Sequence, residues 1–98
     1  MRATVRYLDG HDRRVVQLAD EPVVVGRVAD CTISAKDDTV TRRHACIYPK
    51  DGRHWIKDLG SDNGTWINGK LIKAPQALMH LDKIQCGRFE LEYFIDEG

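Results

Sequence analysis

Residues 58–69 read DLGSDNGTWING, a stretch in which turn-forming residues surround the short run Thr65–Ile67. The pair Asn68-Gly69 suits the centre of a two-residue hairpin turn, because both residues tolerate a positive φ. The same signal recurs at Asp9-Gly10 and at Asp51-Gly52. The sequence therefore predicts three β-hairpins that join short neighbouring strands.

Apolar residues in the rest of the chain alternate with polar ones or form short runs, a pattern typical of β-strands. No window sustains a helical period with caps, and Pro75 interrupts the one candidate region, residues 71–81, so we expect almost no helix. Short strands must cover one another's apolar faces, which predicts an all-β sandwich of two stacked antiparallel sheets. We expect strands at residues 2–8, 14–18, 22–27, 31–34, 44–49, 53–59, 65–67, 70–73, 82–86 and 89–95.

The length and charge of the chain limit its classes of function. A chain of 98 residues has the size of one domain, so we expect a single domain over residues 1–98. Its 15 Lys and Arg residues balance its 15 Asp and Glu residues, which argues against a general attraction to nucleic acid or to an anionic membrane. Any recognition of an anion must therefore depend on local groups.

The cysteine pattern and the lack of long apolar segments in the sequence indicate a reducing compartment. Cys31, Cys46 and Cys86 are widely spaced, odd in number and without a C-x-x-C pair, so we expect buried thiols and neither disulfides nor a metal site. The sequence has no apolar signal core and no run of about 18 apolar residues. We therefore expect a cytoplasmic protein without a membrane partner or a cofactor.

Polar groups suited to holding an anion occur where loops between strands are expected. Arg27 lies at the end of an expected strand, and its forked guanidinium suits a phosphoryl group better than an ammonium does. Thr41 adds a hydroxyl, Arg42 a second cation, and Asn63 a carboxamide that can both donate and accept. For Arg27 alone, the alternative is an ordinary surface arginine or a partner of Asp30.

Three separated blocks of the sequence resemble the forkhead-associated (FHA) domain, and they occur in the order of that family. The blocks are Gly26-Arg27, residues 41–45 (TRRHA) and residues 58–69. Any one block alone would be weak, but three in order are specific. The resemblance implies an eleven-stranded, FHA/SMAD-like β-sandwich that binds phosphothreonine peptides through loops at one end.

The resemblance also implies roles for individual residues. It places Arg27, Thr41 and Arg42 at the phosphate, with Arg43 directed elsewhere, and it places Asn63 on the main chain of the ligand beside the phosphothreonine. His44 would brace the binding loop by hydrogen bonds. Structural roles within the loops are implied for Gly26, His44, Asp58, Ser61, Gly64 and Thr65.

Two residues of the expected site depart from the pattern of the family. Thr41 stands where most relatives have serine, so it keeps the hydroxyl and adds a methyl group. Asp62 stands where threonine or serine is more frequent, and we include it among the residues that contact the ligand. A carboxylate repels a phosphate of about −1.5 to −2 charges unless it points away. Our hypothesis is that Asp62 faces outward and favours a basic residue in the ligand.

The motifs do not indicate an enzyme. His44, Asp58 and Ser61 would complete a catalytic triad on paper, but no sharp strand-to-helix turn surrounds Ser61. Residues 64–70 match the first part of the P-loop motif of nucleotide-binding proteins, but Leu71 follows where that motif requires serine or threonine. The expected function is therefore binding without catalysis.

We expect a signalling adaptor that recognises a phosphothreonine on a Ser/Thr kinase or on a kinase substrate, with roughly micromolar affinity. A first alternative is an FHA-like fold used for phosphate-independent protein assembly, with Thr41 and Asp62 as signs of a weakened pocket. A second is nucleic-acid binding through Arg42-Arg43, Lys70 and Lys73, against which the balanced charge argues. The sequence carries no sign of the oligomeric state.

Overall fold

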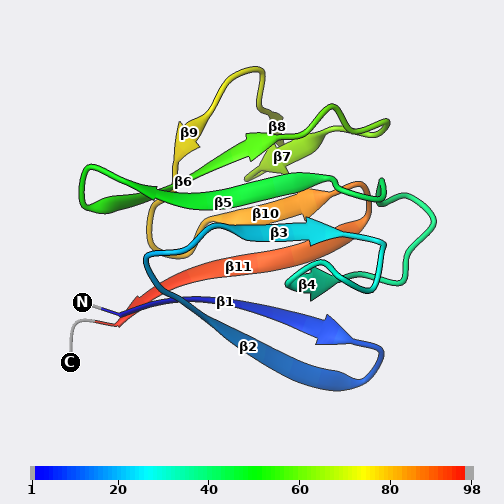
Figure 1. Ribbon diagram of the computed structural model, residues 1–98, viewed down its shortest axis with the longest axis horizontal. Helices are drawn as coiled ribbons and strands as arrows, with labels where there is room; N and C mark the ends of the chain where they lie inside the picture. The colour runs from blue at the N-terminus through cyan, green and yellow to red at the C-terminus, as the bar shows by residue number, and fades with distance from the viewer. Residues whose placement is uncertain (1, 97–98) are drawn as a thin grey trace.

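The computed structural model describes residues 2–96 of the chain, and its regular secondary structure consists of β-strands. They form two sheets stacked as layers (Figure 1), and this part contains no helix, hence none that could cross a membrane. The all-β sandwich predicted from the sequence is confirmed. The strands are β1 (Arg2–Asp9), β2 (Asp12–Leu18), β3 (Val23–Gly26), β4 (Ile33–Ser34), β5 (Ala45–Lys50), β6 (Arg53–Asp58), β7 (Thr65–Ile67), β8 (Lys70–Leu71), β9 (Gln76–Ala77), β10 (Lys83–Cys86) and β11 (Phe89–Asp96).

The order of the strands leaves one long edge. Six strands form the first sheet, in the order β2-β1-β11-β10-β7-β8, and five form the second, in the order β4-β3-β5-β6-β9. β1 and β11 lie side by side along their length, with Arg2 opposite Asp96 and Tyr7 opposite Leu91. Of the four outer strands, β8, β4 and β9 have two residues each, whereas β2 has seven.

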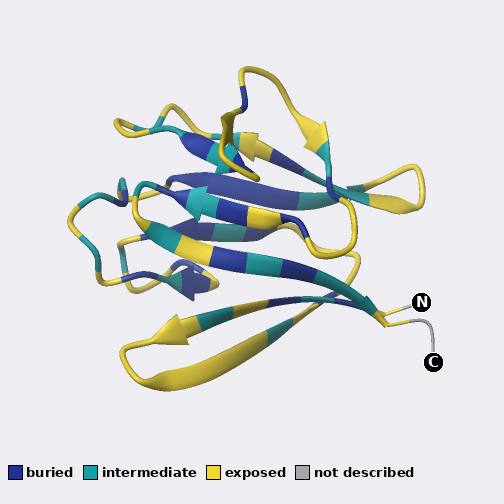
Figure 2. Cartoon of the chain, turned by 180° about the vertical axis from the view of Figure 1, so that it is seen from behind, coloured by how far each residue is buried: buried dark blue, intermediate teal, exposed yellow. Residues whose placement is uncertain are grey.

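Alternation of side chains along the strands fills the space between the two sheets. On β1, Ala3 and Val5 are buried whereas Arg2 and Arg6 are exposed, and the buried residues of β11 alternate in the same way. β5 departs from this alternation, because its first three residues are all buried. Each fully buried aliphatic side chain contributes about 1.5–3 kcal/mol. Figure 2 shows the buried segments in the facing strands and the exposed tip of the β1–β2 hairpin. The largest fully buried apolar side chains are Tyr93, Ile33, Ile47, Ile56, Ile84 and Leu91.

Positive φ values occur at the three predicted hairpin turns. Asp51-Gly52 (φ 54° and 73°) joins β5 to β6, and Asn68-Gly69 (φ 51° and 83°) joins β7 to β8. Two positive values in succession define a type I′ turn, whose twist matches that of the flanking strands. In the first hairpin the centre is shifted by one residue from the predicted position. Asp9 still pairs with Asp12, so Gly10-His11 forms the turn.

Two features of the sheets differ from the predicted arrangement. β4 runs parallel to β3, with Val25 opposite Ile33, whereas we expected only antiparallel neighbours. β9 was not predicted at all, and it pairs Gln76–Ala77 with Trp55–Ile56. Each pairing involves only two residues on the shorter strand, which is too short for a periodic pattern. Neither Gln76 nor Ala77 favours strands intrinsically, so the contact with β6 determines their conformation.

The three cysteines are free and buried thiols, as expected, and of the three only Cys86 belongs to the core cluster between the sheets. Burial raises the pKa of Cys31, Cys46 and Cys86, and it raises that of Cys86 to about 12. The thiolate is the reactive form of cysteine, so these side chains are poor nucleophiles and pack as small apolar groups. Among residues 2–96, no group of three or more His, Cys, Asp or Glu side chains could hold a metal ion.

Candidate functional site

The loops that carry the expected site residues gather at one end of the sandwich (Figure 1). They are the β3–β4 loop (27–32), the β4–β5 loop (35–44), the β6–β7 loop (59–64) and the β10–β11 turn (87–88). Hydrogen bonds join each of these segments to the β4–β5 loop. Residues far apart in the sequence therefore meet on one rim.

Gly26 determines how closely the first two loops approach. A Cβ at this position would lie 2.1 Å from the Arg42 carbonyl oxygen and 2.8 Å from Cys31 Sγ, so only glycine fits. The N–H of the next residue, Arg27, donates to the carbonyl oxygens of Thr41 and Arg42 at 3.2 and 3.1 Å. This close contact gives a physical reason for the structural role expected of Gly26.

The guanidinium of Arg27 is oriented by one bond and keeps its outer donors. Its Nε donates to the carbonyl oxygen of Val40 at 3.0 Å. Its two terminal nitrogens make no hydrogen bond or ion pair within residues 2–96, and the side chain is exposed. A guanidinium held by its inner nitrogen with both terminal groups open is suited to a forked contact with an anion.

Arg42 and Arg43 have different surroundings although they are adjacent. Arg43 Nη2 binds Asp30 Oδ2 at 2.9 Å, so Asp30 is the partner of Arg43 and not of Arg27. The side chain of Arg42 is exposed and makes no ion pair within the described residues. Arg43 is thus engaged in an ion pair, in agreement with the expectation that it points elsewhere, and Arg42 remains a second open cation.

Thr41 is held so that its hydroxyl proton is free. Its Oγ1 accepts the N–H of Asp62 at 3.0 Å, and its own N–H donates to His44 Nδ1 at 3.1 Å. A hydroxyl that accepts one hydrogen bond still has one proton to donate. The bond from Asp62 therefore fixes the oxygen and leaves the O–H available to an incoming acceptor.

His44 connects the two loops that frame the rim, and it is completely buried. Nδ1 accepts the N–H of Thr41, so the proton lies on Nε2, which donates to the carbonyl oxygen of Gly64 at 2.7 Å. Both ring nitrogens are therefore used by backbone groups. Ser61 Oγ is bonded to Asp58 and Gly64 and not to His44, so these residues do not form a catalytic triad.

Asp58 organises the β6–β7 loop from the end of β6. Its carboxylate accepts from Ser61 Oγ at 2.5 Å, from Thr65 Oγ1 at 2.7 Å, and from the N–H groups of Gly60 and Ser61, each at 2.9 Å. Burial alone would raise the pKa of Asp58, but these hydrogen bonds outweigh it and hold the pKa below its ordinary value. Ser61 Oγ in turn accepts from the N–H of Gly64 at 2.9 Å. The loop is therefore rigid around an ionised carboxylate.

Asn63 lies at the tip of this loop and is exposed. Its Nδ2 donates to the carbonyl oxygen of Thr39 at 2.8 Å, and its own carbonyl oxygen accepts from Trp66 Nε1 at 3.1 Å. One further N–H and the side-chain oxygen of Asn63 remain open, because a carboxamide has two donors and an acceptor. The amide is thus oriented within the chain and still able to bind a peptide group.

Thr39 is the residue of this end that sequence reasoning missed. Its hydroxyl donates to Asp37 at 2.6 Å and accepts the N–H of Arg88 at 2.8 Å. The hydrogen bonds from Thr39 hold the pKa of Asp37 below its ordinary value. A Cβ at Gly87 would lie 2.4 Å from the Thr39 carbonyl oxygen, so the β10–β11 turn also needs glycine there. The only sequence signal was a Thr between acidic residues and an arginine pair.

Asp62 contributes its backbone to the site, while its side chain is exposed. The carboxylate makes no hydrogen bond or ion pair within residues 2–96. The N–H of Asp62 is bonded to Thr41, so the backbone of Asp62 is fixed at the rim. Its carboxylate therefore places a negative charge near the adjacent residue Asn63. That Asp62 faces away from the ligand phosphate and favours a basic residue in the ligand remains our hypothesis.

The family model of the FHA domain matches residues 23–87 of this chain. This chain belongs to the FHA domain family. That match contains all three blocks quoted from the sequence, and the expected family is therefore confirmed. As an FHA domain, the chain belongs to a class of phosphothreonine-dependent protein-interaction modules.

Curated relatives and a solved structure agree with this assignment. The chain is 36% identical over 77 residues to the FHA domain-containing protein FhaB of Mycobacterium tuberculosis, covering 79% of this chain and 50% of FhaB. It is 38% identical over 77 residues to the oxoglutarate dehydrogenase inhibitor of Corynebacterium glutamicum, covering 78% of this chain and 53% of that protein. The chain therefore spans about half the length of these relatives.

The solved structure is an FHA domain from a structural and functional study of phosphothreonine-dependent FHA domain interactions. It superimposes with a TM-score of 0.89, at 28% sequence identity, and the match covers 100% of both chains. The likeness extends beyond the matched residues 23–87 to the strands that precede and follow them. The FHA fold thus occupies the described chain from β1 to β11.

Proposed function

We propose that this FHA domain binds a phosphothreonine of a partner protein at the loop end, through Arg27, Thr41, Arg42 and Asn63, and that it acts by binding and not by catalysis. The observation that carries the proposal is the bond from the Asp62 N–H to Thr41 Oγ1. It leaves the hydroxyl proton free one residue after Val40, whose carbonyl oxygen holds the Arg27 guanidinium through Nε. Two donor types then converge on one acceptor site.

The chemistry of the donors favours a dianionic ester. A phosphothreonine has three acceptor oxygens, which can take the two terminal nitrogens of Arg27, the Thr41 hydroxyl and the Arg42 guanidinium. Asn63 would hold the ligand main chain, since its open N–H and oxygen match the two groups of a peptide bond. Each contact uses a group that is not satisfied within the described residues.

The expected affinity follows from these contacts. Hydrogen bonds to charged groups contribute roughly 1.5–3 kcal/mol each. Three or four of them would supply about 5–10 kcal/mol, from which ordering costs of comparable size are subtracted. Micromolar binding, near −8 kcal/mol, is the expectation, and it suits reversible docking. The rigid loops favour the upper part of this range because little ordering remains.

The identity of the partner is also part of the proposal. We expect a phosphorylated cytoplasmic protein, either a Ser/Thr kinase or one of its substrates, since a phosphothreonine requires such a kinase. The names of the two relatives describe an FHA domain-containing protein and an enzyme inhibitor, which fits action by contact with another protein. An interaction module of this kind regulates by bringing proteins together.

Calorimetric titration with a phosphothreonine peptide library and its unphosphorylated copy tests the proposal. The phosphorylated pool should bind, and Arg27→Ala should lose roughly tenfold or more in affinity, about 1.4 kcal/mol. The matched control is Arg53→Ala, an exposed arginine at the start of β6, at the opposite end of the strand from the site. If both peptide pools bind alike, phosphate-independent assembly replaces the proposal.

A further inference from the structure

The outer edge of the six-stranded sheet has no role in the proposed function. β2 forms this edge with seven residues, whereas the outer strands β8, β4 and β9 have two each. Proteins ordinarily shorten, bulge or cover an edge, because its free N–H and C=O groups pair with other chains. β2 contains no proline, and its register with β1 runs without a bulge from Leu18 to Asp12. The only features of β2 that discourage pairing with another chain are the charged residues at its start, Asp12, Arg13 and Arg14.

The ladder with β1 determines which backbone groups of β2 point outward. The two-residue turn makes Asp9 and Asp12 a hydrogen-bonded pair, and every second residue of β2 from there also bonds to β1. The N–H and C=O groups of the residues between them, Arg13, Val15 and Gln17, point away from β1. These groups form a regular row of donors and acceptors along the edge.

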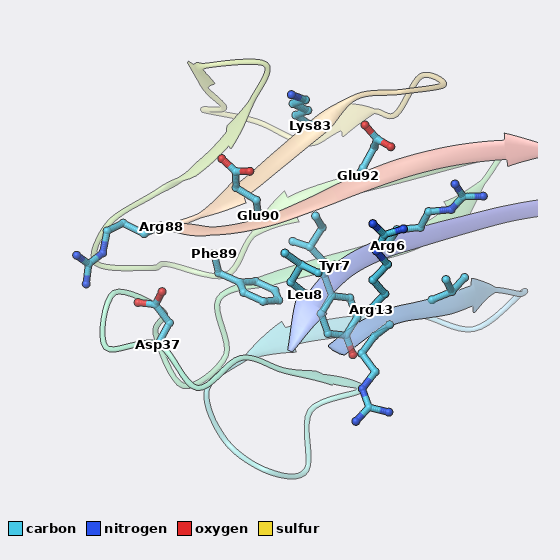
Figure 3. Close-up of a pocket in the computed structure, with 13 residues that line it drawn as sticks. Arg6, Tyr7, Leu8, Arg13, Asp37, Lys83, Arg88, Phe89, Glu90 and Glu92 are labelled. Atoms are coloured by element: carbon cyan, nitrogen blue, oxygen red, sulfur yellow. The ribbon is translucent and has the colours of Figure 1, made fainter. Parts of the chain in front are cut away.

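Val15 lies at the centre of this row and is 61% exposed. On β1 it lies opposite Arg6 and diagonal to Leu8, which is on the same face and 59% exposed. Leu8, Arg13 and Val15 line a hollow of ≈ 750 Å³ on this part of the sheet. Figure 3 labels Leu8 and Arg13 there. A β-branched apolar residue in the middle of a free edge favours pairing with another strand.

We propose that β2 pairs antiparallel with β2 of a second copy of this chain, across a two-fold axis at Val15. Val15 then faces Val15 of the second copy, and Arg13 faces Gln17 of the second copy, so every outward backbone group of these residues obtains a partner. On the inner face, Arg14 faces Val16 of the second copy. No two like charges are directly opposite in this register.

Both neighbouring registers are less favourable than an axis at Val15. An axis one residue later would place Val15 opposite Gln17 of the second copy and separate the two exposed valines. An axis one residue earlier would place Arg14 opposite Arg14 of the second copy, which like-charge repulsion disfavours. The Val15 register instead brings the exposed valines together and satisfies an edge that is complementary to itself. Self-complementarity is what a two-fold interface requires, and it makes the second copy the favoured occupant.

The pairing has a geometric consequence. Antiparallel strands across the axis place the loop ends of the two copies at opposite ends of one continuous sheet. Such a dimer could hold two phosphorylated segments at once, and linked binding raises avidity without new contacts. The pairing itself does not rest on the proposed function. An interface of two strand edges is small, so we expect weak, concentration-dependent association.

Sedimentation velocity from about 10 µM to about 1 mM tests the pairing, because this range covers weak dimers. The wild type should change from monomer to dimer, and Val15→Lys should weaken association by at least about tenfold. The matched control is Leu8→Lys, which adds the same charge to the same face one strand inward. It should leave association within about threefold of wild type.

A charge exchange and an amide measurement complete the test. Val15→Lys mixed with Val15→Asp should associate again, because unlike charges then meet at the axis. In wild type at high concentration, the amides of Val15 and Gln17 should become protected from hydrogen exchange, whereas those of Arg14 and Val16 are protected at every concentration. A wild type that stays monomeric at about 1 mM, or a dimer that Val15→Lys leaves intact, overturns the proposal.

Discussion

The loop end and the β1–β2 hairpin use their polar groups in opposite ways. At the loop end, His44, Asp58 and Thr39 bind backbone groups of neighbouring loops, so the positions of the site atoms are set by the fold. In the hairpin, the outward groups of β2 have no such partners, and Figure 2 shows its tip exposed. In this fold, internal hydrogen bonds orient the groups of the loop end before any ligand binds. The edge of β2, in contrast, gains partners for its outward backbone groups only by association.

We expect the largest effect from a substitution at the centre of the loop end. His44→Leu removes both ring nitrogens from a fully buried position, so the Thr41 N–H loses its partner and the Gly64 carbonyl keeps only the N–H of Gly87 at 3.3 Å. We expect a loss of about 3 kcal/mol in the free energy of unfolding, together with weaker phosphopeptide binding. Urea denaturation and calorimetric titration measure the two quantities.

The matched control for that change is His11→Leu, which alters the exposed histidine of the hairpin turn. It should change the free energy of unfolding by less than about 0.5 kcal/mol. Equal losses in the two variants would contradict the contrast between the two regions.

Gly26→Ala should have the next largest effect. The new Cβ would meet the Arg42 carbonyl at 2.1 Å, so the β4–β5 loop must shift and overpacking should cost about 2–3 kcal/mol. Gly60→Ala is the control, since its added Cβ meets nothing within 4 Å and only its positive φ of 79° is unfavourable. That control should lose about 1 kcal/mol. Thermal unfolding of both variants would show whether close approach or backbone conformation limits the site.

Low pH should destabilise the loop end, because it protonates the carboxylate of Asp58. Its pKa is below the ordinary value, so its stabilising effect is complete at neutral pH and disappears as the pH falls through about 4 and below. Asp58→Asn should lower the free energy of unfolding by about 1–2 kcal/mol at pH 7. The difference between variant and wild type should shrink by pH 3, as measured by urea denaturation at both pH values. A difference that stays constant would exclude the ionised form as the cause.

A smaller effect concerns ligand choice. Asp62→Thr removes a charge near the proposed phosphate site, so affinity for phosphopeptides without basic residues should rise about threefold, or roughly 0.6 kcal/mol. Peptides with lysine near the phosphothreonine should gain less or lose affinity. Fluorescence anisotropy with the two peptide classes measures this, and equal gains for both would refute the outward, lysine-favouring role.

The smallest effect should appear in the hairpin. Leu8→Thr replaces a side chain that is 59% exposed on β1 with another β-former, so the free energy of unfolding should change by less than about 0.5 kcal/mol. Phosphopeptide affinity should not change. A loss beyond about 1 kcal/mol would mean that the hairpin face is packed in solution, which would sharpen the case for a covering partner.

The sequence predicted those parts of the fold that leave a local signal. Turn dipeptides such as Asn68-Gly69 require a positive φ whatever surrounds them, and alternation on β1 reports one buried face. The FHA blocks indicated the family because they contain residues that the fold requires. Gly26 is an example, since any side chain there would collide with the Arg42 carbonyl. Local chemistry of this kind can be read directly.

Features that depend on contacts between distant residues could not be predicted. Thr39 matters because Asn63 and Arg88 approach it from other loops, and nothing in its own surroundings indicates this. β9 exists through its pairing with β6, and the parallel contact of β4 with β3 is too short to leave a period. The same limit applies to the open edge of β2, which follows from sheet order alone.

The bond from Trp66 Nε1 to the Asn63 carbonyl gives the domain an optical reporter of its own. Any ligand that engages Asn63 must alter the field and hydration around this partly exposed indole, so emission from Trp66 should shift on binding. Trp55 bonds instead to the Lys50 carbonyl beside the β5–β6 turn, and it can serve as the internal reference. Occupancy of the rim can therefore be followed in unlabelled protein.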